Sequence, residues 1–115
     1  MVMQIATSQQ YGTKVVSITG QIQDMDCQKL QEAFGALAAG EKPNIAADLS
    51  KVSFLDSSAL GTFISALKSV KSRGGDLRLA GLGDAVMDIF DTTRLSSLFQ
   101  IHPTIDQAVH SFSEK

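Results

Sequence analysis

The chain has 115 residues, of which 43% are hydrophobic and 19% charged, and its formal net charge is −2. This length supports one domain with a single core, and the composition is that of a soluble globular protein rather than a disordered one. The basic residues Lys68, Lys71 and Arg73 lie close together in the sequence, but acidic residues elsewhere balance them. We therefore expect a solvated helix face there and no direct binding of nucleic acid.

The single cysteine, Cys27, cannot form an internal disulfide, so nothing indicates an oxidising compartment. It falls among the apolar positions of a helical pattern, which predicts a small buried core residue. The first residues lack the basic start and apolar run of a signal peptide, and no apolar stretch approaches the length of a membrane span. We expect a cytoplasmic protein without membrane insertion.

Strand and helix signals alternate along the chain, with a turn at residues 9–12 and Gly74-Gly75 as a later stop. In chain order, the predicted elements are a strand over 3–8, a strand over 14–19, a helix from 24 toward 40, a strand over 45–49, a helix over 60–70, a strand over 77–82, a helix from 84 to about 92, a short strand over 98–101 and a helix over 105–112.

Several helix starts carry recognisable caps. Either Asp24 or Asp26 could cap the first helix, and Asp84 is the expected cap of the third. Thr104 stands three residues before Gln107, which is a capping-box spacing. The methionines form no stripe, so we assign all of them to the core or the terminus: Met1, Met3, Met25 and Met87.

This order of elements predicts one α/β domain over residues 1–115. Strand–helix–strand connections of this length favour right-handed crossovers and a parallel core, while the first two strands favour an antiparallel hairpin. We expect a mixed, mostly parallel sheet of about four to five strands packed with about four helices.

Three small polar residues, Asp56, Ser57 and Ser58, stand together at the start of the second helical pattern. One of them suffices to cap a helix, so a further hydroxyl is more than the fold requires. A serine in the first turn lies beside unpaired backbone N–H groups and the positive end of the helix dipole, which can hold a phosphate. Phosphorylation would add about two negative charges, which Asp56 would reinforce, and would repel an acidic partner.

A purely structural interpretation of the same residues stays open, because Asp56, Ser57 and Ser58 could do no more than cap the helix. In that interpretation, Gly61 allows close packing of the first helical turn.

Sequence signals for catalysis are weak. Ser57 does not lie in a Gly-x-Ser-x-Gly elbow, and only His102 and His110 could serve it as a base. One cysteine and two distant histidines do not supply a metal site. We therefore expect no catalytic residue, metal or cofactor, and hydrolysis through Ser57 is the remaining enzymatic alternative.

The chain resembles the STAS domain, and specifically the stand-alone anti-sigma factor antagonists of bacterial partner-switching pathways. The similarity extends from about residue 3 to residue 112. It is carried by Asp48-Leu49, by Phe54-Leu55-Asp56-Ser57-Ser58-Ala59-Leu60-Gly61, by Gly74-Gly75 before Leu77-Arg78-Leu79, and by Val86-Met87-Asp88-Ile89-Phe90 followed by Leu95 and Phe99.

In that family, the serine directly after the aspartate is phosphorylated by a partner that is both an anti-sigma factor and a serine kinase. The resemblance implies that Ser57 is this serine, that Asp56 orients the loop and the kinase contact, and that Ser58 caps the helix. It further implies that the unphosphorylated protein binds the anti-sigma factor and so releases a sigma factor. A metal-dependent serine phosphatase would restore this state.

The resemblance also implies a partner surface next to Ser57, because the region after the second strand lines it in the family. The corresponding residues here are Gly20, Gln21, Gln23 and Asp24. The family tends to carry an acid about three positions after the glycine, whereas the first acid here is Asp24. The resemblance leaves one alternative from another class, a STAS scaffold or subunit of a larger signalling or transporter complex whose serine is not modified.

Overall fold

The computed structural model describes residues 2–113, which form five strands, four α-helices and two short 3-10 segments. In chain order these are β1 (Gln4–Gln10), β2 (Thr13–Ile22), η1 (Asp24–Asp26), α1 (Cys27–Leu37), β3 (Asn44–Leu55), α2 (Ser57–Ser72), β4 (Asp76–Ala80), α3 (Asp84–Thr92), η2 (Leu95–Ser97), β5 (Ile101–His102) and α4 (Ile105–Ser111).

The five strands form one sheet in the order β1-β2-β3-β4-β5. Only the β1–β2 pair is antiparallel, and the other three pairs are parallel. The hairpin turns at Tyr11 and Gly12, whose φ angles of 51° and 81° give the left-handed backbone of a two-residue hairpin loop. The mixed, mostly parallel sheet with an amino-terminal hairpin is therefore confirmed.

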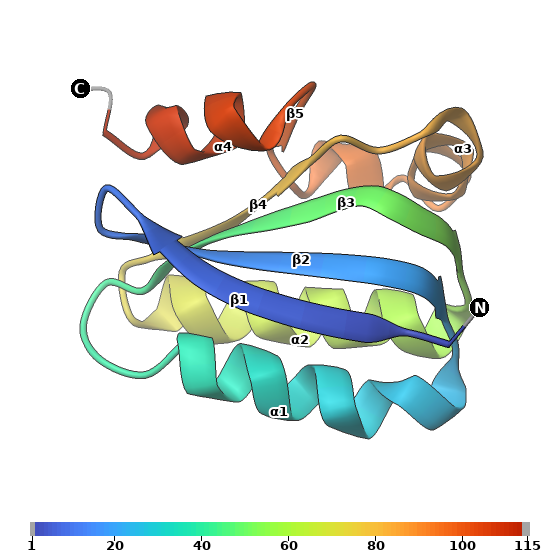
Figure 1. Ribbon diagram of the computed structural model, residues 1–115, viewed down its shortest axis with the longest axis horizontal. Helices are drawn as coiled ribbons and strands as arrows, with labels where there is room; N and C mark the ends of the chain where they lie inside the picture. Colours follow the sequence, from blue (N-terminus) through green and yellow to red (C-terminus); the bar gives the residue numbers. More distant parts are fainter. Residues whose placement is uncertain (1, 114–115) are drawn as a thin grey trace.

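Helices cover both faces of the sheet (Figure 1). α1 and α2 lie on one side and pack through an edge-on contact between Phe34 and Phe63, whose ring centroids are 5.3 Å apart. α4 lies on the other side, where Ala108 and Val109 are buried.

Cys27 is free and buried, as the helical pattern predicts. Among residues 2–113, no helix is long and apolar enough to cross a membrane.

β3 continues to Leu55, well beyond the apolar segment that predicts it. Its core-facing side chains are separated by steps of two residues and then of three: Ile45, Ala47, Leu49, Val52 and Leu55. Each three-residue step matches a shift of register against β2. A β-bulge places two residues opposite one and so interrupts the alternation of side chains. The second half of β3 consequently lacks the period of two by which strands are found in sequences.

In the carboxy-terminal third of the chain, the structure differs from two expectations. The short strand predicted over 98–101 is present but lies later in the chain: Phe99 is buried edge-on against Phe90 at 5.9 Å, and β5 begins only at Ile101. The assignment of Asp84 as a cap is wrong. Gly83 takes the cap position, and Asp84 is the first residue of α3.

Candidate functional site

The predicted site lies where two parallel strands end. Ile22 at the end of β2 is paired with Leu55 at the end of β3, so the residues that follow each strand meet at one edge of the sheet. Asp56 also donates its N–H to the carbonyl oxygen of Ile22, at 3.2 Å. The structure thereby brings the segment after β2 to the first turn of α2, as the resemblance implies.

The carboxylate of Asp56 holds this edge together through both oxygens. Its Oδ1 accepts a hydrogen bond from the N–H of Ala59 at 2.9 Å, which makes Asp56 the N-cap of α2. Its Oδ2 accepts a second bond, also of 2.9 Å, from the N–H of Asp24, 32 residues earlier. The expectation that Ser58 caps the helix is therefore wrong, because the aspartate does so and also fixes the neighbouring segment.

Ser57 is the first residue of α2, and its side chain is exposed. Within residues 2–113, its hydroxyl makes no hydrogen bond, and the N–H groups of Ser57 and Ser58 have no acceptor. These two N–H groups are among the donors that an α-helix leaves unsatisfied at its start. An anion attached to Ser57 would meet free donors and the positive end of the helix dipole.

The four residues predicted to follow the second strand differ in what they can offer a partner. Gly20 and Gln21 belong to β2 rather than to a loop, and Gly20 is buried with a φ of 98°. Gln21, Gln23 and Asp24 are exposed, and Nε2 of Gln23 donates to Oε1 of Gln21 at 3.3 Å. Gly20 therefore shapes the strand, while the other three form surface next to Ser57.

Asp26, one of the two expected caps, takes the N-cap position of α1, but its side chain makes no hydrogen bond to the N–H groups of that helix. Its Oδ2 accepts the N–H of Gln23 at 3.0 Å, and the N–H of Asp26 donates to the carbonyl oxygen of Gln23 at 2.8 Å. Asp24 does not occupy a cap position and begins the 3-10 segment η1. Both aspartates therefore stabilise the turn that leads from β2 into α1.

Gly61 lies one helical turn after Ser57, on the same face of α2, and is exposed. An added Cβ would have no other atom within 4 Å, so Gly61 does not serve the close packing that the sequence suggests. The molecule's own packing does not explain this glycine.

We predict that Gly61→Ala stabilises the protein by about 0.5–1 kcal/mol, because alanine is the better helix former and restricts the unfolded chain. Urea unfolding followed by circular dichroism measures the change. A loss of stability would show that the position tolerates no side chain.

The two histidines lie away from Ser57. The ring of His110, on α4, is 5.6 Å from that of Tyr11 in the hairpin turn, which Figure 1 shows at the opposite end of the sheet from the start of α2. His102 lies in β5, and its Nε2 is buried without a hydrogen-bond partner among the described residues. The fold does not bring either histidine to Ser57 as a base.

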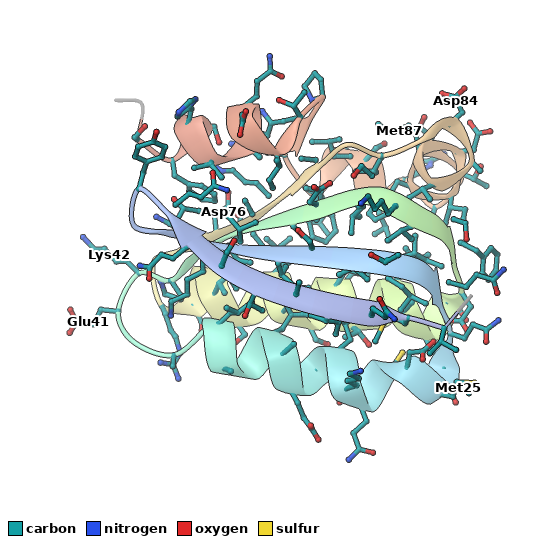
Figure 2. The ribbon with its side chains drawn as sticks, in the orientation of Figure 1. Met25, Glu41, Lys42, Asp76, Asp84 and Met87 are labelled. Carbon is teal, nitrogen blue, oxygen red and sulfur yellow. The ribbon has the colours of Figure 1, made fainter. Side chains whose placement is uncertain are left out.

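Two large apolar side chains near Ser57 are exposed, and for Met25 this contradicts the expectation. Met25, assigned to the core from the sequence, is 83% exposed, and Phe54 is 42% exposed. Figure 2 shows Met25 pointing outward at the carboxyl end of β2. Met3 is buried as predicted, and Met1 lies outside the described residues. The sequence carries no signal for Met25, because a 3-10 turn interrupts the helical period there.

Comparison with known proteins gives concordant results. The sequence model of the STAS domain matches residues 4–108. The anti-sigma-B factor antagonist of Listeria monocytogenes is 34% identical over 86 residues, which cover 75% of each chain. The antagonist of Bacillus subtilis is 34% identical over the same length, covering 75% of this chain and 78% of its own.

The crystal structure of an anti-sigma factor antagonist from Mycobacterium paratuberculosis superposes with a TM-score of 0.88. It is 26% identical, and the match covers 98% of this chain and 96% of that one. A match of the family model over most of the sequence, together with this fold, shows that the chain belongs to the STAS domain family.

Proposed function

We propose that the protein is a cytoplasmic anti-sigma factor antagonist that works as a phosphorylation-controlled binding switch, with Ser57 as the residue that takes the phosphate. The observation that carries this proposal is the separation of roles at the start of α2. Asp56 alone caps the helix, and the hydroxyl of Ser57 is exposed without a structural task. Two relatives are named anti-sigma-B factor antagonists, and these names indicate that the partner is an anti-sigma factor.

A phosphate on Ser57 can be accommodated without rebuilding the fold. The N–H groups of Ser57 and Ser58 point along the helix axis toward its start and are free to donate to phosphate oxygens. The two bonds of the Asp56 carboxylate do not involve Ser57, so they persist after modification. The modification therefore changes the surface and leaves the scaffold as it is.

The protein is the substrate in this cycle and not the catalyst. The unphosphorylated form binds an anti-sigma factor that has serine kinase activity, and a sigma factor is released. The kinase phosphorylates Ser57 and the complex separates, after which a metal-dependent serine phosphatase restores the binding form. The distance of His102 and His110 from Ser57 supports binding rather than hydrolysis.

Titration against the purified anti-sigma factors encoded in the same genome tests the proposal. We expect the unchanged protein and Ser57→Ala to bind one of them, and Ser57→Asp to bind it at least about tenfold more weakly, a loss of about 1.4 kcal/mol. Isothermal titration calorimetry gives the affinities, and displacement of the sigma factor gives the biological readout.

Ser69→Asp is the matched control, because Ser69 is an exposed serine near the other end of α2 and the substitution adds the same charge. This variant should bind like the unchanged protein. Equal weakening by both aspartates would assign the effect to net charge, and binding of none of the anti-sigma factors would favour a scaffold role instead.

A further inference from the structure

Two of the large apolar side chains that the fold leaves exposed belong to the segments that meet at Asp56. Met25 follows Asp24, whose N–H donates to the Asp56 carboxylate, and Phe54 precedes Asp56 by two residues. Both segments are held rigidly, one by this hydrogen bond and the other by pairing of β3 with β2. Met25 and Phe54 are therefore presented on fixed backbone beside Ser57.

The exposure of Phe54 follows from the second bulge in β3. Gly20 is paired with Val52 and Gln21 with Phe54, so Ser53 is the additional residue. With strict alternation, Phe54 would share the core face with Val52 and Leu55 would point to the other face. The bulge instead sends Leu55 into the core, where it is 2% exposed, and turns Phe54 outward.

A third segment, the first part of α2, contributes an exposed glycine, Gly61. It costs helix stability relative to alanine, and no atom of the molecule occupies the place of a Cβ. It shares a helix face with Ser57, so the absence of a side chain leaves room for close approach from outside.

We propose that Met25, Phe54 and Gly61 form an apolar docking face around Ser57 on which the anti-sigma factor binds. This inference rests on the proposed function and adds the residues that provide affinity. Phenylalanine and methionine are enriched in protein interfaces, and a few anchoring side chains carry most of the binding energy there. The glycine allows the partner's backbone to approach the first turn of α2.

Charge distinguishes this partner from a second copy of the chain. Asp24, Asp26 and Asp56 lie within the face, and among the described residues none of them forms an ion pair with a lysine or arginine. A symmetric contact between two copies would bring these carboxylates together, which is unfavourable. The face fits a partner with apolar sockets bordered by cationic side chains.

This face changes the physical account of the switch. A partner with cationic borders would not be repelled by the charge of a phosphate. The complex is lost because a dianion on Ser57 must give up its hydration between two apolar contacts. Salt screens charge repulsion between exposed groups but not this desolvation, so the two accounts differ in their salt dependence.

The test compares Met25→Ser and Phe54→Ser with Tyr11→Asn, in binding to the anti-sigma factor identified by titration. Tyr11 is as exposed as Met25, at 83%, and lies in the hairpin turn at the opposite end of the sheet. We expect each of the first two variants to bind at least about tenfold more weakly and the control to bind within about twofold of the unchanged protein. Because Met25 contributes almost nothing to the core, its variant stays folded.

A second pair separates stability from binding. Gly61→Ala should raise the urea midpoint and still weaken binding at least about fivefold, whereas Gly35→Ala should raise the midpoint alone. Gly35 is the matched control because it is helical and its added Cβ also meets no atom within 4 Å. Between about 0.05 M and about 0.5 M NaCl, the ratio of affinities for the unchanged protein and Ser57→Asp should change less than about threefold.

The inference is overturned if Met25→Ser or Phe54→Ser binds within about twofold of the unchanged protein, if Gly61→Ala does so, or if the affinity ratio falls about tenfold in high salt. If any of these results is obtained while Ser57→Asp still weakens binding as expected, the proposed function stands and only the docking face is wrong. When the unchanged protein binds no anti-sigma factor, the proposed function itself fails.

Discussion

Replacing Gly75 with alanine is expected to destabilise the protein by about 3 kcal/mol. A Cβ on Gly75 would lie 1.8 Å from the carbonyl oxygen of Pro43 and 2.5 Å from its carbonyl carbon, both of which are backbone atoms. Since Pro43 directly precedes β3, the clash can be relieved only by moving the start of a central strand. The backbone of Gly75 also ends α2, because its N–H donates to the carbonyl oxygen of Val70 at 2.8 Å.

Urea unfolding of Gly75→Ala measures this loss, and Gly35→Ala is the control because its added Cβ meets no atom within 4 Å. The control should be as stable as the unchanged protein or slightly more stable. If Gly75→Ala lost less than about 1 kcal/mol, the close approach of residues 43 and 75 would not be essential to the fold.

Asp56→Ala is expected to cost about 2.5–4 kcal/mol, more than the loss of an ordinary helix cap. The substitution removes the cap of α2, which is worth about 1 kcal/mol, and also the charged acceptor of the Asp24 N–H, worth about 1.5–3 kcal/mol. The segment between β2 and α1 should then loosen, which hydrogen exchange at the Asp24 amide would detect.

Thr104→Ala separates the two contributions, because Thr104 only caps a helix, accepting the N–H of Gln107 at 3.2 Å. Its loss should be near 1 kcal/mol. Equal losses for Asp56→Ala and Thr104→Ala would show that the bond to Asp24 contributes nothing to stability.

The helices and the sheet could largely be predicted from the sequence, because their apolar residues keep a regular period. The helical spacing of Leu30 and Phe34 identifies α1, and both residues are buried. The period fails where the backbone is irregular. Two bulges conceal the second half of β3, and a 3-10 turn hides the exposure of Met25. Short-range signals also mislead at α3, where Gly83 rather than Asp84 occupies the cap position.

The two segments of the candidate site could be predicted from the sequence, but the contacts that join them could not. The resemblance selects Ser57 over its neighbours, and the pattern of small polar residues marks the helix start. The bond from Asp24 to Asp56 joins residues 32 positions apart, and it depends on the register of two parallel strands. That register is set by bulges that leave no local signal, so the double role of Asp56 emerges only from the structure.

Incubation of the purified protein with ATP and the anti-sigma factor identified by titration tests the central claim most directly. Mass spectrometry should locate one phosphate, on Ser57, and calorimetry should show that the phosphorylated protein no longer binds at a concentration where the unchanged protein is saturated. Phosphate on another residue, or a phosphorylated Ser57 that binds as tightly as before, would contradict the account.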